Sequence, residues 1–514
     1  MPKTPSNKLF RLVKSLSGSE KRYFKIYVKS KGDKNNKYIL LFDAIDAQEE
    51  FDEEQLKLAV YANEPIQSRK YSELKAYLYD IILKSLQSYD EKTSVDFRLK
   101  GLLQGVKVLY KRLLLEDCKD LLQKAKKLAH KYERFTSLLE ILDWEKQIAY
   151  AQTNIAFLDK ALGRIEKEEQ EAALQQQQIS ELRNIFLRLL VGIRKDASMR
   201  RKEQQTRIKS LVEAPILQNI NQVRSHHARI LYYRIHSLYY YALIDFENFY
   251  QTGKKLLELM EAKPIFLEED VSEYISVLSN LVASCSILVR YEEMKQYLER
   301  FKTLRTKTSD DELKIHRQYY LGQFEYCIRT GNFKTGLELL VQHQKEAKRF
   351  DKKHFESNSF YFNYFYIHFG VNDYSKALEY LNQWLNLPRN IERQELQSMA
   401  RILNLIIHYE IGNTLLIESL IRSTYRFLQK RDGLNELESK VMNFIKNSHK
   451  IHSRRELKTV LKTLKKDIQD LPFLPAEKAV LKLFDIEAWL ESKIQNKPFS
   501  QVIQEKYASL TVEN

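Results

Sequence analysis

The middle of this chain carries a short pattern that recurs about every 41 residues. An aromatic residue is followed three positions later by a small or apolar one, and threonine takes the aromatic place in the last, weakest copy. The pairs are Tyr250/Gly253, Tyr291/Met294, Phe333/Gly336, Tyr374/Ala377 and Thr414/Ile417, with first members 41, 42, 41 and 40 residues apart. A period of roughly 20–50 residues is typical of stacked supersecondary units. The pattern therefore predicts an array of helical hairpins.

Composition favours helices joined by short turns. The 514 residues include only 13 glycines and 9 prolines, whereas average usage is roughly 7% and 5%. Scarce glycine disfavours sandwiches, barrels and α/β folds, whose turns and phosphate loops use it. We therefore expect an all-α fold.

The cysteines and the hydropathy pattern indicate in which cellular compartment the protein resides. Cys118, Cys285 and Cys327 are widely spaced and odd in number, so neither a disulfide framework nor a CxxC metal site is expected. No run of 18 apolar residues occurs, and the first residues lack the apolar core of a secretion signal. We expect a cytoplasmic protein with no membrane partner.

Three segments are expected along the chain. Residues 1–92 are predicted to form a basic module of four to five helices, in which three short helices also permit a helix-turn-helix arrangement. Residues 93–497 are predicted to hold eight or nine hairpins, whose second helices begin at the repeated aromatic. Residues 155–196 form either one long helix or two broken near the glutamine run, and residues 498–514 form a C-terminal tail.

Two segments of the array resemble tetratricopeptide repeats. In that family a Gly-Asn-Tyr-like turn precedes the second helix, and a small residue three positions after the aromatic lets neighbouring helices approach closely. Gly331, Phe333 and Gly336 of GNFKTGLELL match these places, as do Tyr374 and Ala377 of NDYSKALEYL. The resemblance implies a right-handed superhelix whose first helices line a concave groove.

The likeness to tetratricopeptide repeats covers residues 224–430 clearly and 95–500 loosely. The period is about 41 rather than 34 residues, so HEAT-like packing remains a second interpretation. The bias toward Lys, Asn, Ile and Tyr is also similar to that of helical-repeat proteins from AT-rich bacterial genomes.

Motifs of catalysis are missing from the sequence. It contains no phosphate loop and no GxGxxG, GxSxG or HExxH. His226 and His227 are adjacent and so point in different directions on a helix, which disfavours joint ligation of a metal. We expect no enzyme activity, no cofactor and no metal.

Aromatic residues are concentrated in the predicted first helices, as in the run FYFNYFY at 360–366. Two interpretations remain open: the rings fill a thick core between long helices, or some of them line a groove and bind a partner. Tyr239, Tyr320 and Tyr364 represent the groove interpretation.

Positive charge is the other candidate for binding. The net charge is +16, and it gathers near both ends of the chain. Such patches attract phosphate backbones or acidic proteins, although they are more often solvated helix faces. The candidate residues are Lys21, Arg22, Lys25 and Lys29 in the amino-terminal module, and Lys458, Lys462 and Lys466 near the carboxyl end.

Together these features predict a non-enzymatic adaptor or scaffold that binds a protein or peptide on the concave face of a helical-repeat array. The alternative is a nucleic-acid-linked regulator, in which residues 1–90 contact DNA or RNA.

Overall fold

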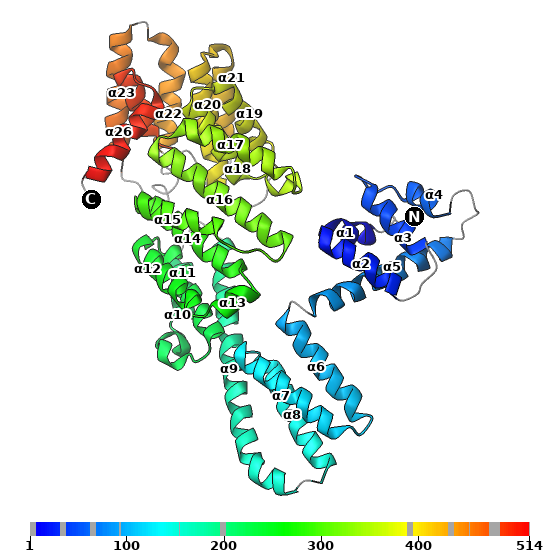
Figure 1. Cartoon of the computed structure of the whole chain (residues 1–514). Helices are drawn as coiled ribbons and strands as arrows, with labels where there is room; N and C mark the ends of the chain where they lie inside the picture. The colour runs from blue at the N-terminus through cyan, green and yellow to red at the C-terminus, as the bar shows by residue number, and fades with distance from the viewer. Residues whose placement is uncertain are drawn as a thin grey trace. The chain divides into compact units, whose positions relative to one another are not determined.

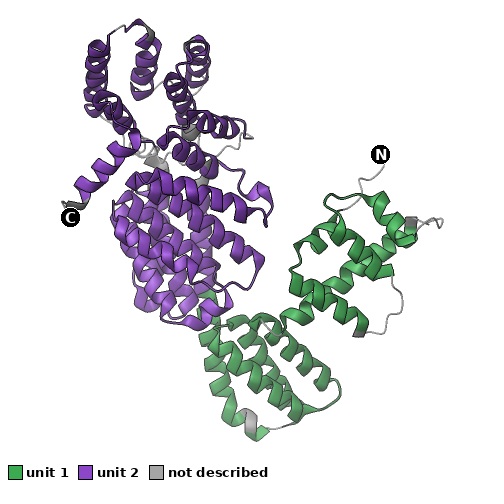
Figure 2. Cartoon of the chain, turned by 45° about the horizontal axis from the view of Figure 1, so that its top comes forward, with its two compact units in different colours: residues 1–177 green, residues 178–514 purple. Residues whose placement is uncertain are grey.

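The computed structural model describes residues 7–30, 37–61, 68–91, 94–153, 155–195, 202–387, 394–429, 436–451, 453–471 and 484–512. These residues form helices joined by turns, and no strand occurs among them (Figure 1). The predicted all-α class is therefore confirmed. The chain divides into two compact units, residues 1–177 and 178–514 (Figure 2).

The first unit begins with a module of five helices and continues with longer helices that pack in sequence order. Its elements are α1 (Lys8–Ser15), α2 (Gly18–Ser30), α3 (Lys37–Ala47), α4 (Glu53–Tyr61), α5 (Ser68–Asp90), α6 (Val95–Tyr110), α7 (Leu115–Lys131) and α8 (Phe135–Ala151). The next helix, α9 (Ile155–Lys195), is continuous, so the interpretation with one long helix is correct. It contains residues of both units.

A capping box and a buried aromatic pair organise the five-helix module. The Glu20 N–H donates to Ser17 Oγ at 3.3 Å, and the Ser17 N–H donates to Glu20 Oε2 at 2.6 Å, which completes a capping box at the start of α2. Helix α2 packs on α5, and α3 packs on α1 and α4. The rings of Phe24 and Phe42 stack at 4.4 Å in the buried centre of this module.

The second unit continues the same pattern of consecutive packed helices. Its α-helices are α10 (Lys202–Val212), α11 (His226–Ala242), α12 (Phe246–Glu261), α13 (Pro264–Glu269), α14 (Ser272–Ile287), α15 (Tyr291–Lys302), α16 (Ser309–Thr330), α17 (Phe333–Ala347), α18 (Asn358–Gly370), α19 (Tyr374–Leu385), α20 (Gln394–Ile411), α21 (Thr414–Gln429), α22 (Glu436–Asn447), α23 (Arg454–Gln469), α25 (Ile486–Gln495) and α26 (Phe499–Val512). Short 3₁₀ turns lie at Pro215–Leu217, Ile220–Gln222, Lys352–His354 and Ser448–Lys450.

One turn geometry joins many of these helices. A residue in the left-handed region follows the first helix, and the next amide donates to the carbonyl five positions back, as from Asp373 to His368 at 2.9 Å. This is the Schellman motif, which satisfies carbonyls that a helix end leaves without partners. In the described part of the chain the left-handed residues of such turns are Leu113, Glu133, Ile244, Val289, Gly331, Asn372, Gly412 and Asn496.

The helix starts agree with the repeated aromatic at some hairpins and differ from it at one. Helices α15, α17 and α19 begin at the repeated aromatic, as predicted. Helix α12 begins at Phe246, so the predicted start at Tyr250 is wrong. The left-handed turn residues Ile244 and Val289 are 45 residues apart, whereas the next turn residues follow at intervals of 42, 41 and 40. The turn before α12 therefore comes earlier in the chain than the repeated aromatic predicts.

The small residues of the pattern lie at close helix contacts. A Cβ on Gly336 would lie 3.3 Å from the Cβ of Cys327 and 3.4 Å from Ile367. Ala377 is completely buried, and so is Met294, which takes the small residue's place in α15. These positions therefore pack the seams between hairpins, as the pattern predicts.

The predicted C-terminal tail is a helix instead. Residues 499–512 form α26, which packs on α16 and α25. Phe499, Val502 and Ile503 are buried, and Gln504 Nε2 donates to the carbonyl of Gly331 at 3.0 Å. The segment forms a helix because its apolar residues at helical spacing pack on the preceding helices.

Candidate binding surface

The tyrosines predicted to line a groove are mostly in the core. Tyr320 is 2% exposed and Tyr364 is 5% exposed, so the groove interpretation is wrong for both. Tyr239 is half-buried. The physical reason is the packing of α16, α17 and α18, whose aromatic faces interlock. They form an aromatic cluster that includes His316, Tyr320, Phe324, His343, Phe355, Phe360 and Tyr364.

Two buried histidines satisfy the polar atoms inside this aromatic cluster. His316 Nε2 lies 3.0 Å from His343 Nδ1, and His343 Nε2 lies 2.6 Å from the hydroxyl of Tyr364. Both bonds form with both rings neutral, because each imidazole then donates once and accepts once. Burial lowers the pKa of His316 to about 4 and that of His343 to about 3. The network is therefore a neutral structural element.

The amino-terminal basic cluster is divided between two environments. Lys21 pairs with Asp46 at 2.6 Å and Lys25 pairs with Asp43 at 2.7 Å, both acids coming from α3. Arg22 and Lys29 are exposed. Helix α3 therefore supplies carboxylate partners to two of the four candidate cations, Lys21 and Lys25.

The carboxyl-terminal basic residues are arranged differently. Lys458, Lys462 and Lys466 are exposed at intervals of four residues on α23, which places them along one face. The neighbouring Lys465 pairs instead with Glu491 of α25. We call these three lysines the α23 stripe.

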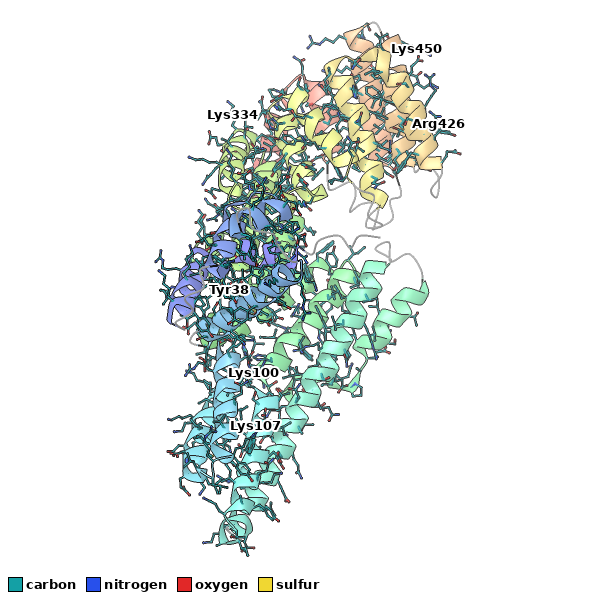
Figure 3. The ribbon with its side chains drawn as sticks, turned by 90° about the vertical axis from the view of Figure 1, so that its right-hand side faces the viewer. Tyr38, Lys100, Lys107, Lys334, Arg426 and Lys450 are labelled. Carbon is teal, nitrogen blue, oxygen red and sulfur yellow. The ribbon has the colours of Figure 1, made fainter. Side chains whose placement is uncertain are left out.

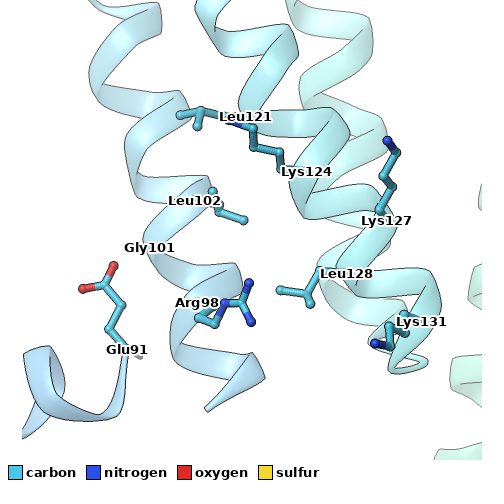
Figure 4. A pocket seen from close by; sticks show the side chains of 9 residues that line it. All are labelled: Glu91, Arg98, Gly101, Leu102, Leu121, Lys124, Lys127, Leu128 and Lys131. Carbon is cyan, nitrogen blue, oxygen red and sulfur yellow. The ribbon is translucent and has the colours of Figure 1, made fainter. Parts of the chain in front are cut away.

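A groove between α6 and α7 was not singled out from the sequence. It has a volume of about 540 Å³ and is lined by Glu91, Arg98, Gly101, Leu102, Leu121, Lys124, Lys127, Leu128 and Lys131 (Figure 4). The two helices approach closely at Gly105, where a Cβ would lie 3.0 Å from Leu121 Cδ1. This close contact brings the apolar side chains of α6 and α7 together at the floor of the α6–α7 groove.

Four cations and one carboxylate lie around this floor. Figure 4 shows Arg98 projecting from α6 toward α7, near Leu128. All four cationic side chains are exposed, and none forms an ion pair with another residue in the part of the chain that the structure describes. The α6–α7 groove thus combines an apolar floor with positive charge that the chain leaves unneutralised.

The opposite face of α7 shows how the same helix neutralises its other charges. Lys126 Nζ lies 3.1 Å from Glu145 and 2.9 Å from Glu168, and His130 Nε2 lies 2.8 Å from Glu168. Burial tends to raise the pKa of Glu168, but Lys126 and His130 hold it below its ordinary value. Helix α7 is therefore neutralised toward α8 and α9 and cationic toward the α6–α7 groove.

The lysine spacing on α7 is the signal that could have identified this groove. Lys124, Lys127 and Lys131 stand at i, i+3 and i+7, which is one helix face. The sequence does not reveal that Lys126, in the same run, faces two carboxylates. That distinction depends on α8 and α9.

A second groove lies between α21 and α22. It has a volume of about 720 Å³, and Arg422, Tyr425, Arg426 and Lys446 line it. Figure 3 labels Arg426 among the side chains of this unit. Arg422 lies 3.9 Å from Glu418, and the Tyr425 hydroxyl accepts from Gln429 Nε2 at 2.9 Å, so part of its polar surface is satisfied internally.

Possible metal ligands and the three cysteines are the remaining groups with reactive side chains. Among the described residues, no group of three or more His, Cys, Asp or Glu is placed to hold a metal ion. The three cysteines are buried, and burial raises the pKa of Cys285 and of Cys327 to about 12. Such thiols are poor nucleophiles because the thiolate is disfavoured. No helix in the described ranges is long and apolar enough to cross a membrane.

Comparison with known proteins adds no family. The sequence matches no protein-family model and no curated protein. What this chain binds is therefore inferred from the geometry and charge of its surfaces.

Proposed function

We propose that this chain is a non-enzymatic adaptor that binds a protein or peptide partner. The observation that carries the proposal is the α6–α7 groove, where four cations without carboxylate partners surround an apolar floor. Exposed ions without partners are well solvated and contribute little to the stability of the isolated fold. Beside an apolar surface, the same ions can form ion pairs with a partner that also covers the apolar groups.

We further infer that the described helices from α11 to α21 in the second unit form a right-handed superhelix of the tetratricopeptide type. Two observations support this arrangement: the repeated Schellman turns, and the packing of α12, α14, α16 and α18 in succession. Arrays of this kind present long surfaces on which separate partners bind, which suits an adaptor.

The test is partner capture that depends on groove residues. Full-length chain carrying a photocrosslinker near the α6–α7 groove is expressed in its native cells, as the natural sequence and as a Lys124→Glu/Lys127→Glu variant. A protein crosslinked by the natural sequence and lost with the variant supports the proposal. If no crosslinked protein depends on these lysines, the adaptor proposal fails for this groove.

Lys100 and Lys107 provide the matched control. They are exposed on α6 outside the groove lining (Figure 3). The variant Lys100→Glu/Lys107→Glu makes the same change in net charge, so it separates loss of a specific contact from loss of general positive charge.

A nucleic-acid-linked regulator is the second candidate, and the α23 stripe favours it. The stripe has exposed ammonium groups at regular spacing, and residues 446–466 carry eight Lys/Arg against one acid. If it binds duplex DNA, log affinity should fall with log salt by about 0.9 per phosphate neutralised. A Lys458→Glu/Lys462→Glu/Lys466→Glu variant that binds DNA like the parent would remove this candidate.

A further inference from the structure

The α6–α7 groove offers two kinds of contact at once, and this restricts what it can hold. Leu102, Leu121 and Leu128 supply the apolar floor, and the cations stand around it. Among the described residues that line the groove there is no aromatic ring, so these residues lack the stacking platform on which single-stranded nucleic acids usually lie. A phosphate backbone would leave the leucines without apolar contacts.

We infer that the α6–α7 groove binds an acidic peptide segment that carries apolar side chains between its carboxylates. The inference rests on the proposed adaptor function and names the chemistry of its partner. Leucine-like side chains of the segment fill the floor, and its carboxylates meet the lysines of α7. Charge complementarity selects the acidic segment, because a basic or neutral one would leave the groove cations unpaired.

The spacing of the lysines sets the spacing of the carboxylates. Lys124 and Lys131 are separated by seven residues, which is about 10.5 Å along α7 at roughly 1.5 Å per residue. A helical partner segment lying along α7 meets both with acids at i and i+7, and with a third at i+3 or i+4 opposite Lys127. Its apolar residues must then lie on an adjoining face, toward the leucine floor.

The volume limits the length of the segment. A site of about 540 Å³ falls within the range of roughly 300–1,000 Å³ that encloses a small ligand. It therefore accepts only a few side chains, and the rest of the partner lies outside the groove.

Fluorescence anisotropy with defined peptides tests the inference. The full-length chain is titrated against a labelled helical peptide that has Glu on the α7 spacing and Leu on the adjoining face. Two matched peptides replace every Glu by Gln or every Leu by Ser, and a short DNA duplex of similar charge is the fourth probe. We expect tightest binding to the Glu/Leu peptide, with both replacements weakening it.

Charge reversal connects this binding to the groove. Each surface ion pair is worth roughly two- to fivefold in affinity, so Lys124→Glu/Lys127→Glu should weaken binding of the Glu/Leu peptide at least about tenfold, because reversal also adds repulsion. Lys100→Glu/Lys107→Glu should change it less than about threefold. Circular dichroism checks folding, and Lys124→Gln/Lys127→Gln serves if the reversal variant is unstable.

Several results would overturn the inference. These are no binding of the Glu/Leu peptide, equal binding of the Leu→Ser peptide, or equal losses with the two reversal variants. Preferential DNA binding that depends on Lys124 and Lys127 would assign the groove to nucleic acid instead. If cellular crosslinking depends on these lysines while the peptide fails to bind, the adaptor function stands and the acidic amphipathic partner does not.

Discussion

The aromatic cluster of α16–α18 and the α6–α7 groove differ in where their polar groups find partners. In the cluster, His316, His343 and Tyr364 satisfy one another inside the core. In the groove, Lys124 and Lys127 have no carboxylate partner, although Lys126 between them has two. Neutral polar groups can be buried once they are hydrogen-bonded, whereas a charge stays at the surface unless another element supplies a counterion. Unpaired charge beside an apolar floor therefore distinguishes the α6–α7 groove from the aromatic cluster.

The largest effect expected concerns the buried tyrosine of the cluster. Tyr364→Ala should lose about 3–5 kcal/mol of unfolding free energy, because it empties a buried aromatic site and removes the hydroxyl partner of His343 Nε2. Tyr239→Ala is the control and should lose much less, since Tyr239 is half-buried. Urea unfolding measures both. Equal losses would mean that the two rings lie in the same environment.

Lowering the pH should reduce the stability of the aromatic cluster before it protonates ordinary carboxylates, because the two histidines are buried as neutral rings. The ordinary histidine pKa is about 6.5, and in the folded chain burial lowers it to about 4 for His316 and about 3 for His343. The unfolded chain therefore binds protons first, so stability is full above pH 6.5 and falls as the pH drops toward 4. Glu346 and Arg349 face His316 and act on its pKa in opposite directions.

A pH series of urea unfolding measures this loss, which should be on the order of 3 kcal/mol at pH 4 by linkage. A His343→Leu variant should be less stable at pH 7 but should lose less stability between pH 6.5 and 4.5. An unchanged pH slope in the variant would contradict this role for the histidine pair.

The close contacts between hairpins predict an intermediate effect. Ala377→Leu and Gly336→Leu should each cost roughly 1–3 kcal/mol, because both side chains would enter filled seams. Lys376→Leu is the matched control at the neighbouring, exposed position of α19. If all three variants melt like the parent, the assignment of these residues to the seams is wrong.

The smallest expected effect concerns two neighbouring lysines on opposite faces of α7, which differ in whether they have carboxylate partners. Lys126→Gln should cost about 1–2 kcal/mol, because it leaves two partly buried carboxylates without their ammonium. Lys127→Gln, one residue away, should stay within about 0.5 kcal/mol, because its ammonium has no carboxylate partner. Thermal melting of the two single variants gives the answer. If Lys127→Gln lowers the melting temperature as much as Lys126→Gln does, the groove lysines contribute to the stability of the fold.

Part of the fold was predictable because its causes are local. The starts of α15, α17 and α19 follow from an aromatic residue that packs at the first turn of a helix. The cap at Ser453, whose side chain accepts from the Glu456 N–H at 3.1 Å, follows from two residues three positions apart. The start of α12 escaped prediction because Ile244 adopts the left-handed conformation, for which glycine or asparagine is the usual sequence signal.

The candidate binding surface was less predictable than the fold. The lysines of the α23 stripe were candidates because positive charge gathers near the carboxyl end, and all three are exposed. The burial of Tyr364 was not predictable because the run at 360–366 is aromatic all round and has no periodicity to separate its buried side from its exposed side. The α6–α7 groove was missed because lysine spacing alone does not indicate which cations are neutralised.

The sequence by itself determined the helical class, several helix starts and the small residues of the seams. These depend on backbone hydrogen bonds and side-chain spacing within a few residues. Only the tertiary structure decided that α26 packs on α16, that Lys126 is paired while Lys127 is not, and that Tyr364 bonds to His343. The physical reason is that burial and ion pairing depend on which distant element approaches a side chain, and no local pattern in this chain specifies that approach.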